Sequence, residues 1–376
     1  MHFALTEEQI ELASTVRALV ARRAGTVDVR AAIVTEAGYD TELWSTLCEQ
    51  IGVAALAIPE EYGGAGFSSF ETHVVLEELG ATLTPTPLLG SGVIATQALL
   101  RSGNAAACER ILPDLASGES TAALAWASAD GELRPDGAAV TATGSADAWT
   151  LSGAAGLVLE GAAADVLLVI ADTGAGIGLF EVAPDAAGVT REVTPALDPT
   201  LRFATIRFEN AAATPISTDY AGALAALYAI GATAVTALQT GGARRALELT
   251  VAYLKEREQF GRPLASFQAL KHRAADLVVD TETSVSMSWS AAWAIAQADL
   301  SDWAPTEAAE AVRQAGLAKA WCSDAFSHVT SEMIQLHGGI AITWEHDAHL
   351  YFKRAHACAQ LFGRAAEHRR SIKVQL

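Results

Sequence analysis

Residues 257–264 read REQFGRPL, residues 266–268 continue SFQ, and residues 335–339 read QLHGG. The sequence around these stretches is rich in alanine, with apolar residues at helical spacing from about Tyr220 onward. Glycines and Pro263 interrupt that pattern, as does the segment Asp302–Pro305. The C-terminal part is therefore predicted to consist of long helices whose breaks fall at these motifs.

Upstream of Tyr220 the pattern changes twice. From Thr6 to about Ala116 the spacing is helical again, with Thr6 placed to cap the first helix and acidic residues in its first turn. Between these helical parts lie short apolar runs bounded by Gly, Asp and Pro, which are typical of a small, mostly antiparallel β domain. The runs are Ala122–Trp126, Ala139–Thr143, Trp149–Ser152, Val166–Ala171, Gly178–Val182 and Phe203–Phe208.

Helices, then strands, then helices predict an α+β chain with segregated layers. We place an N-terminal α-helical domain at residues 1–118, a middle antiparallel β domain at 119–216, and a C-terminal four-helix bundle at 217–376. The segment Gly174–Gly178 is close to a dinucleotide-binding fingerprint, but its third glycine would fall on Leu179 and the residues after it resemble a returning strand. A hairpin turn is expected there.

The overall charge and the cysteines exclude several classes of protein. With 44 acidic and 25 basic residues the net charge is −19, which disfavours binding to nucleic acid. The four cysteines form no CxxC pair, so neither a disulfide framework nor a thiolate zinc site is expected, and a reducing cytoplasm fits best. The N-terminus does not resemble a signal peptide, and the uncharged segment Tyr220–Ala243 predicts a buried bundle helix better than a membrane span.

The two C-terminal motifs offer what a diphosphate needs. The guanidinium of Arg257 can form paired, charge-assisted hydrogen bonds with phosphate oxygens. Gly338 and Gly339, at a helix break, can present backbone N–H groups with no side chain in the way. The alternative is that Arg257 pairs with a nearby carboxylate and that the two glycines only end a helix.

Both motifs in this order, the chain length, the α–β–α arrangement and the turn Pro59–Gly64 resemble the acyl-CoA dehydrogenase family across nearly the whole chain. The resemblance implies a dimer of dimers in which the ADP half of FAD reaches the neighbouring subunit. The cofactor-binding residues that the resemblance implies are Arg257, Gln259, Phe260, Gln268, Gln335, Leu336, His337, Gly338 and Gly339. For one residue of this cofactor-binding set, Phe260, packing in the protein core is an alternative explanation.

The same comparison exposes what the chain lacks. Desaturation of an acyl-CoA needs a carboxylate to remove the α proton, and the two positions where the family keeps its glutamate are Gly363 and Gly231 here. The segments that resemble the family's flavin-ring contacts also depart from its pattern, because Ala125–Asp130 and Leu157–Leu159 replace them. We therefore assign no catalytic residue to this chain.

This pattern resembles the non-catalytic subunit of actinobacterial heteromeric (α2β2) acyl-CoA dehydrogenases, several of which act on CoA thioesters of sterol side chains. It implies an FAD shared with a related subunit that carries the glutamate, an acyl-CoA substrate from sterol or fatty acyl degradation, and electron-transfer flavoprotein as acceptor. The alternatives are a self-sufficient homotetramer with an unlocated base, and an assembly protein without flavin. His337, His346, His349 and His356 could suggest a metal, but no Glu or Cys completes a ligand set and none is expected.

Overall fold

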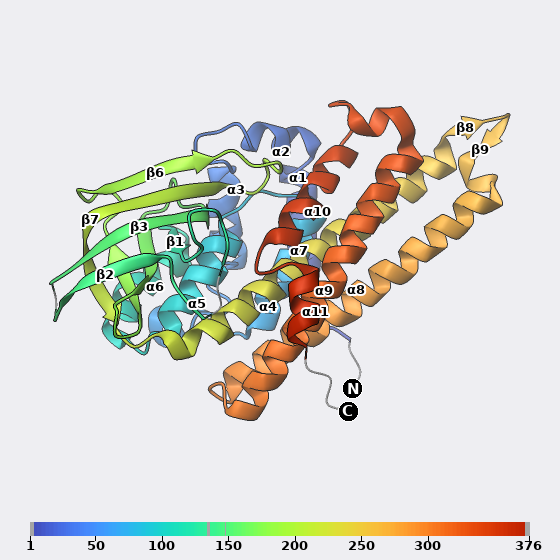
Figure 1. Cartoon of the computed structure of the whole chain (residues 1–376). Helices are drawn as coiled ribbons and strands as arrows, with labels where there is room; N and C mark the ends of the chain where they lie inside the picture. The colour runs from blue at the N-terminus through green and yellow to red at the C-terminus, as the bar shows by residue number, and fades with distance from the viewer. Residues whose placement is uncertain (1–3, 134–135, 147, 373–376) are drawn as a thin grey trace. The chain divides into compact units, whose positions relative to one another are not determined.

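The computed structural model describes residues 4–133, 136–146 and 148–372. It divides into two compact units (Figure 1). The bundle unit comprises Met1–Ala31, His73–Thr84 and Ala232–Leu376, and the sheet unit comprises Ala32–Thr72 and Pro85–Gly231. Along the chain, N-terminal helices are followed by a β region and then by C-terminal helices, as predicted from the sequence.

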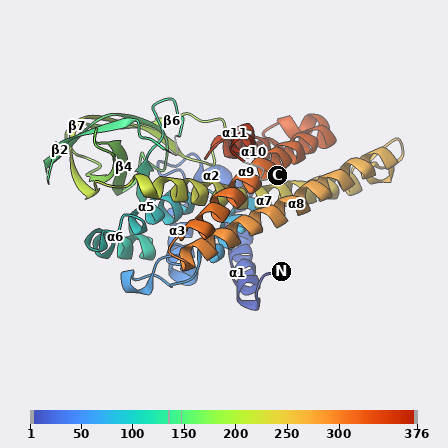
Figure 2. The ribbon, with the colours of Figure 1, turned by 60° about the horizontal axis from the view of Figure 1, so that its bottom comes forward.

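The bundle unit is built on three long helices and several shorter ones. The first helix starts with the predicted cap, since Gln9 N donates to Thr6 Oγ1 at 3.2 Å and Thr6 N donates to Gln9 Oε1 at 3.0 Å. Figure 2 shows α8 and α9 running side by side. The helices are α1 (Glu7–Arg23), α2 (Thr26–Ala32), α4 (Ser69–Ala81), α7 (Ala221–Glu256), α8 (Gln268–Leu300), α9 (Pro305–His337), α10 (Ala348–Gln360) and α11 (Ala365–Ser371).

Breaks between the long helices fall where the sequence predicts them. A two-stranded hairpin, β8 (Glu258–Gln259) and β9 (Arg262–Pro263), follows α7 and leads through the 3₁₀ turn η4 (Leu264–Ser266) into α8. After α9 the chain makes a second 3₁₀ turn, η5 (Gly338–Ile342). The core of this end of the unit contains Leu254, Phe326, Met333, Leu336 and Tyr351.

The sheet unit contains a seven-stranded sheet whose order is β1-β4-β2-β3-β7-β5, with β6 paired to β7. Because β4 also pairs with β5, the path β4-β2-β3-β7-β5 closes on itself. Most pairs are antiparallel, as expected, but β1–β4 and β2–β4 are parallel. The strands are β1 (Ala122–Ala125), β2 (Val140–Ser145), β3 (Ala148–Leu159), β4 (Val166–Asp172), β5 (Ile177–Val182), β6 (Val189–Thr194) and β7 (Phe203–Ser217).

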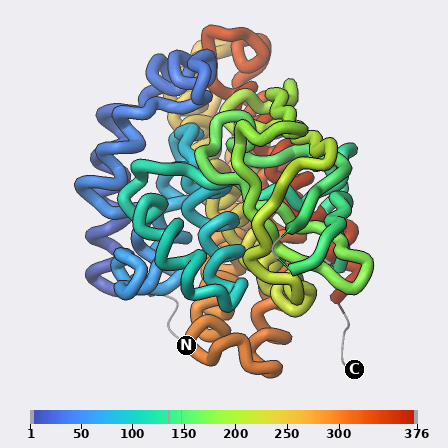
Figure 3. Tube along the Cα trace, turned by 90° about the vertical axis from the view of Figure 1, so that its left-hand side faces the viewer, coloured from blue at the N-terminus to red at the C-terminus, as the bar shows by residue number. Residues whose placement is uncertain are grey.

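Short helices pack against this sheet. Asn104, the cap of α6, donates from Nδ2 to Ile216 O of β7 at 2.9 Å, and Arg110 of the same helix forms an ion pair with Glu181 of β5. In Figure 3 the sheet strands run from green to yellow-green beside the cyan helices. The helical elements are α3 (Thr41–Thr46), η1 (Leu47–Ile51), η2 (Glu60–Tyr62), η3 (Leu88–Ala95), α5 (Thr96–Leu100) and α6 (Ala105–Ser117).

The turn after β4 agrees with the prediction, and strand β6 is an addition to it. The glycine segment after β4 is a hairpin turn, because Thr173 N donates to Gly176 O at 2.9 Å and β5 returns antiparallel to β4. Strand β6 was not predicted, because its sequence VTREVT has only two apolar residues and none of its side chains is fully buried.

One described helix, α7, is long and apolar enough to cross a membrane. Its most apolar window is 72% buried inside the protein, as in the core helix of a helical bundle. The cysteines Cys48, Cys108, Cys322 and Cys358 are all free and buried.

Candidate functional site

The first motif is a tight hairpin at the end of α7. Arg257 N closes the last helical turn on Tyr253 O at 2.8 Å, and Leu264 N donates to Arg257 O at 2.8 Å. Phe260 and Gly261 form the turn with φ of 55° and 74°, which matches the two-residue turn that antiparallel strands prefer. The hairpin therefore projects from the end of the helix.

Side chains of this hairpin are available to a ligand or a partner. The Arg257 side chain is exposed and makes no ion pair with any residue that the structure describes, so the carboxylate-pairing alternative is not seen. Phe260 is 92% exposed and contacts the Phe267 ring edge-on, with ring centroids 6.2 Å apart, so core packing does not explain it in this chain. Gln259 is also exposed. Gln268 begins α8, exposed, with its Nε2 2.8 Å from His272 Nε2.

The second motif ends α9. Leu336 is buried in the core of the bundle unit, whereas Gln335 is exposed on the last helical turn. Gly338 ends the helix with φ of 68°, and its N–H donates to Ile334 O. A Cβ atom added at Gly338 or Gly339 would meet no atom within 4 Å, so the backbone of both residues is open to a ligand.

His337 joins the two motifs. Tyr253, one turn before Arg257, stacks on His337 with ring centroids 4.4 Å apart, and its hydroxyl donates to His337 O at 3.3 Å. Arg257 and the turn at Gly338 thus belong to neighbouring helix ends. Burial lowers the pKa of His337, so its imidazole is neutral at physiological pH.

Glycine, not a carboxylate, occupies both positions at which the family keeps its proton-abstracting glutamate. Gly231 is buried in α7. Gly363 has φ of 88°, and its carbonyl accepts a hydrogen bond from the buried ammonium of Lys319 at 2.9 Å. Glu345 and Glu367, the glutamates that follow the Gln335–Gly339 motif in the sequence, are both exposed. Glu367 caps α11 by accepting a hydrogen bond from Arg364 N at 2.9 Å.

In the sheet unit, the two segments that resemble ring-binding segments are closed against each other. Ser128 pairs with Ala155 in an isolated bridge, and Gly156 N donates to Ser128 O at 3.0 Å. The Leu157 side chain covers Gly131. Trp126 is buried and donates from its indole nitrogen to Gly137 O at 3.1 Å, which is a structural role. These two segments are thus in direct contact with each other.

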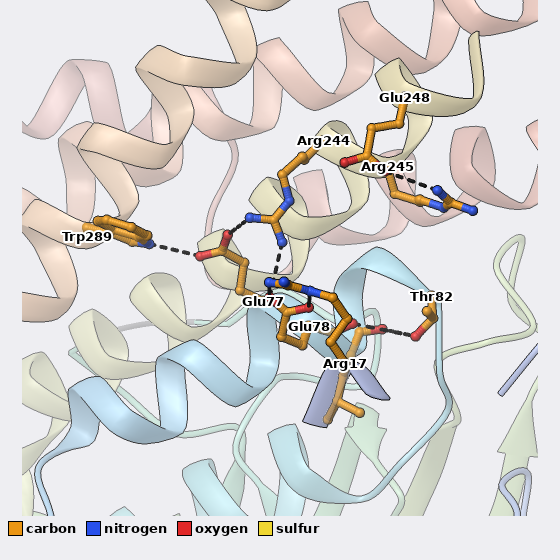
Figure 4. A network of polar contacts seen from close by, with 9 residues as sticks. Arg17, Glu77, Glu78, Thr82, Arg244, Arg245, Glu248 and Trp289 are labelled. Atoms are coloured by element: carbon orange, nitrogen blue, oxygen red, sulfur yellow. Dashed lines mark hydrogen bonds and ion pairs between the residues drawn. The ribbon is translucent and has the colours of Figure 1, made fainter. Parts of the chain in front are cut away.

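A buried ionic network in the bundle unit was not predicted from the sequence. Glu77 and Glu78 of α4 are each 4% exposed, and Arg244 of α7 contacts both, at 2.6 Å and 3.3 Å (Figure 4). Arg17 of α1 forms a further pair with Glu78 at 2.6 Å, and Trp289 Nε1 donates to Glu77 at 2.8 Å. Two adjacent acidic residues inside the apolar run of α4 were the only sequence signal.

Within the described residues no group of three or more His, Cys, Asp or Glu side chains could hold a metal ion. His346 and His349 do not share a helical face, because α10 begins at Ala348. His346 instead precedes the helix, and its Nδ1 accepts from Ala348 N at 3.0 Å.

Family models and sequence relatives both match this chain to acyl-CoA dehydrogenases. Residues 6–119 match the acyl-CoA dehydrogenase N-terminal domain and residues 223–376 match the acyl-CoA dehydrogenase C-terminal domain. The acyl-CoA dehydrogenase IpdE2 of Mycolicibacterium smegmatis is 39% identical over 372 residues, which cover 99% of this chain and 100% of that protein.

Solved structures show the same similarity. The ChsE4–ChsE5 complex from Mycobacterium tuberculosis contains a chain with a TM-score of 0.87 and 29% identity, and the match covers 98% of this chain and 97% of that one. Butyryl-CoA dehydrogenase from Megasphaera elsdenii has a TM-score of 0.84 at 22% identity over 98% of both chains, which shows a shared fold.

Proposed function

This chain belongs to the acyl-CoA dehydrogenase family, whose members are FAD-dependent oxidoreductases of lipid metabolism, and from that premise we propose a specific role for it. It takes part in α,β-desaturation of an acyl-CoA thioester as the subunit that supplies the ADP-side contacts of a shared FAD. A related subunit supplies the glutamate and the flavin-ring contacts.

One observation carries this proposal. Arg257, the open backbone at Gly338–Gly339 and the Tyr253–His337 contact between them form a prepared site for a diphosphate, while glycine stands at both positions of the base. A chain that keeps the ADP-side contacts to FAD but lacks the catalytic glutamate needs a second chain that supplies this glutamate. The segments around Gly131 and Leu157 support the same proposal, because they contact each other and depart from the family's flavin-ring pattern.

The residues fit the ADP half of the cofactor chemically. The Arg257 guanidinium neutralises a diphosphate through charge-assisted hydrogen bonds, and the backbone N–H groups at Gly338–Gly339 donate to its oxygens without steric hindrance. Gln268 and Gln335 add exposed amide donors and acceptors near the two helix breaks. Bound FAD supplies the hydride acceptor, and this chain's part in the reaction is to bind and orient it.

The substrate class and partners are inferred from relatives. One similar structure is a complex of two chains, ChsE4 and ChsE5, and another is named as a steroid acyl-CoA dehydrogenase, at 30% identity and a TM-score of 0.85. These support a sterol-derived acyl-CoA as substrate and a heteromeric assembly. Electron-transfer flavoprotein is the proposed acceptor and the cytoplasm the proposed compartment.

The test is co-expression with a related chain that retains the glutamate, followed by native mass measurement and flavin quantification. We expect a complex with both chains in equal numbers and one FAD per pair, and dehydrogenase activity only in the complex. The chain expressed alone is the control and should be nearly colourless. A homotetramer of this chain with four FAD and full activity would overturn the proposal, and so would an active heteromer whose FAD content is unchanged when this chain carries Arg257→Ala.

A further inference from the structure

The loop that contains the Gly338–Gly339 turn has little support from the protein core. Between residues 338 and 345 every residue except Ala341 is exposed, including Ile342 and Trp344, which are 73% and 63% exposed. Because so little apolar surface is buried, packing alone does not fix this loop, and its geometry depends on the polar contacts at its ends. A backbone that is to donate hydrogen bonds to an anion needs such a fixed geometry.

The end of this loop is held by two side chains of α2. Arg30 donates to Asp347 Oδ1 at 2.8 Å and to His346 O at 3.3 Å. Thr26, one turn earlier, donates from its hydroxyl to the second carboxylate oxygen of Asp347. The side chains of Arg30 and Asp347 are only 22% and 23% exposed, so water screens this pair less than a fully exposed one. We call Thr26, Arg30 and Asp347 the α2 clamp.

Ring contacts connect the α2 clamp to the glycine turn. Arg30 Cζ and Lys353 Nζ lie 5.4 Å and 4.8 Å from the centroid of the Trp344 ring, which belongs to the same loop. The His346 ring lies 4.6 Å from that of His337, the residue directly before the glycine turn. A movement of the loop away from α2 would therefore disturb contacts both before and after the two glycines.

We propose that Arg30 is a positioning residue for the diphosphate site: through Asp347 it orders the loop, and with it the Gly338–Gly339 backbone, before the ligand binds. Order that is present before binding lowers the entropy cost of binding. Arg30 thus acts through the loop and not through its own charge. This inference rests on the proposed function and adds to it a residue that lies on α2, outside both sequence motifs.

The opposite charges of the two clamp partners separate positioning from direct attraction. Loss of the Arg30 cation would weaken the binding of an anion under either explanation. Asp347 is itself an anion, so its loss would strengthen the binding of an anion if charge alone mattered. Positioning requires the opposite result, because the loop is held only when both partners are present. The Asp347 side chain makes no capping hydrogen bond to α10, so its replacement removes no cap from that helix.

The test measures the binding of inorganic pyrophosphate to the full chain by calorimetry. We expect Arg30→Ala and Asp347→Ala each to weaken binding about threefold to tenfold, and the double variant to bind no more weakly than either single one. Hydrogen exchange of residues 340–347 should be faster in these variants than in the parent chain, and pyrophosphate should slow it again. Arg369→Ala, which breaks an arginine–aspartate pair between α11 and α9, is the matched control and should change neither binding nor exchange of this loop.

Arg257→Ala separates failure of this inference from failure of the proposed function. If Arg257→Ala weakens binding while Arg30→Ala does not, or if Asp347→Ala strengthens binding, the α2 clamp has no positioning role and the diphosphate site stands. If Arg257→Ala has no effect, or pyrophosphate does not bind the parent chain at millimolar concentration, the diphosphate site and its positioning are both refuted.

Circular dichroism and thermal unfolding of each variant confirm that it is folded at the temperature of the binding measurement. Thr26→Val is the milder variant if a larger change unfolds the chain, because it removes only one of the two hydrogen bonds to the Asp347 carboxylate. It should weaken pyrophosphate binding in the same direction as Arg30→Ala, and unchanged binding would contradict the proposal.

Discussion

At the residue scale, the largest effect of burial on a histidine is at His73 of α4. Its Nε2 lies 2.9 Å from Ser288 Oγ of α8, which lies 2.8 Å from Thr236 Oγ1 of α7. Burial lowers the pKa of His73 to about 3, because a charged imidazole would lose its hydration at this position. The native protein therefore holds His73 neutral.

We expect this histidine to make stability depend on pH. The unfolded chain takes up a proton near pH 6.5 and the folded chain does not, so stability is constant above pH 6.5 and falls as the pH is lowered toward 3. The slope from this residue is about 1.4 kcal/mol per pH unit, or about 2 kcal/mol between pH 6.5 and pH 5. Denaturant unfolding at several pH values should show a shallower dependence for His73→Gln and an unchanged one for the exposed His356→Gln. Equal slopes for His73→Gln and the parent protein would contradict the expectation.

At the element scale, α4 and α7 are joined by close packing and by buried charge. A Cβ atom added to Gly241 of α7 would lie 1.9 Å from Glu77 O of α4, so the helices approach more closely than any larger residue permits. Burial raises the pKa of Glu77, and Arg244 opposes that shift by favouring the ionised form. Arg244 is thus the nearest cation to Glu77, whereas Arg17 lies closer than Arg244 to Glu78.

Neighbouring arginines on α7 allow a matched test. Arg244→Met leaves the buried Glu77 without its cation, so we expect a loss of about 3–5 kcal/mol of stability. Arg245→Met breaks the exposed pair with Glu248, whose two side chains are 45% and 54% exposed, and a hydrogen bond with Tyr351, but leaves no buried carboxylate without its cation, so it should cost about 1 kcal/mol. Urea unfolding of both variants measures the difference. Similar losses for the two would mean that the network in Figure 4 contributes no more than a surface pair.

At the scale of the whole molecule, we expect added FAD to increase the stability of the isolated chain only slightly. A ligand that binds only the folded state stabilises it by about 4.1 kcal/mol at a thousand times its Kd. Because the partner subunit supplies the flavin-ring contacts in the proposed assembly, the affinity of the single chain for FAD should be far below that of the heteromer. Thermal unfolding with added FAD should therefore raise the Tm of the heteromer by several degrees and barely change that of the chain alone. Equal shifts would indicate a self-sufficient FAD site.

Local signals in the sequence were enough for the order of helical and strand regions, for the breaks between the long helices and for the two motifs, but not for the lengths of β3 and β7 or for β6. The Thr6 cap, the hairpin at Gly174 and the helix breaks at Gly261 and Gly338 each depend on a few adjacent residues, whose backbone preferences act within one turn. The absence of a glutamate at Gly231 and Gly363 could also be read directly from the sequence.

Only the tertiary structure decided which of these residues meet. Tyr253 and His337 are far apart in sequence, and so are Glu77 and Arg244, or His73 and Ser288. The exposure of Phe260, the cations over Trp344 and the closing of Leu157 over Gly131 depend in the same way on how distant segments pack. The sequence by itself determined where helices end and what chemistry is present, because those follow from local backbone and side-chain preferences. Burial and partner choice depend on contacts between segments distant in the chain, which no local pattern specifies.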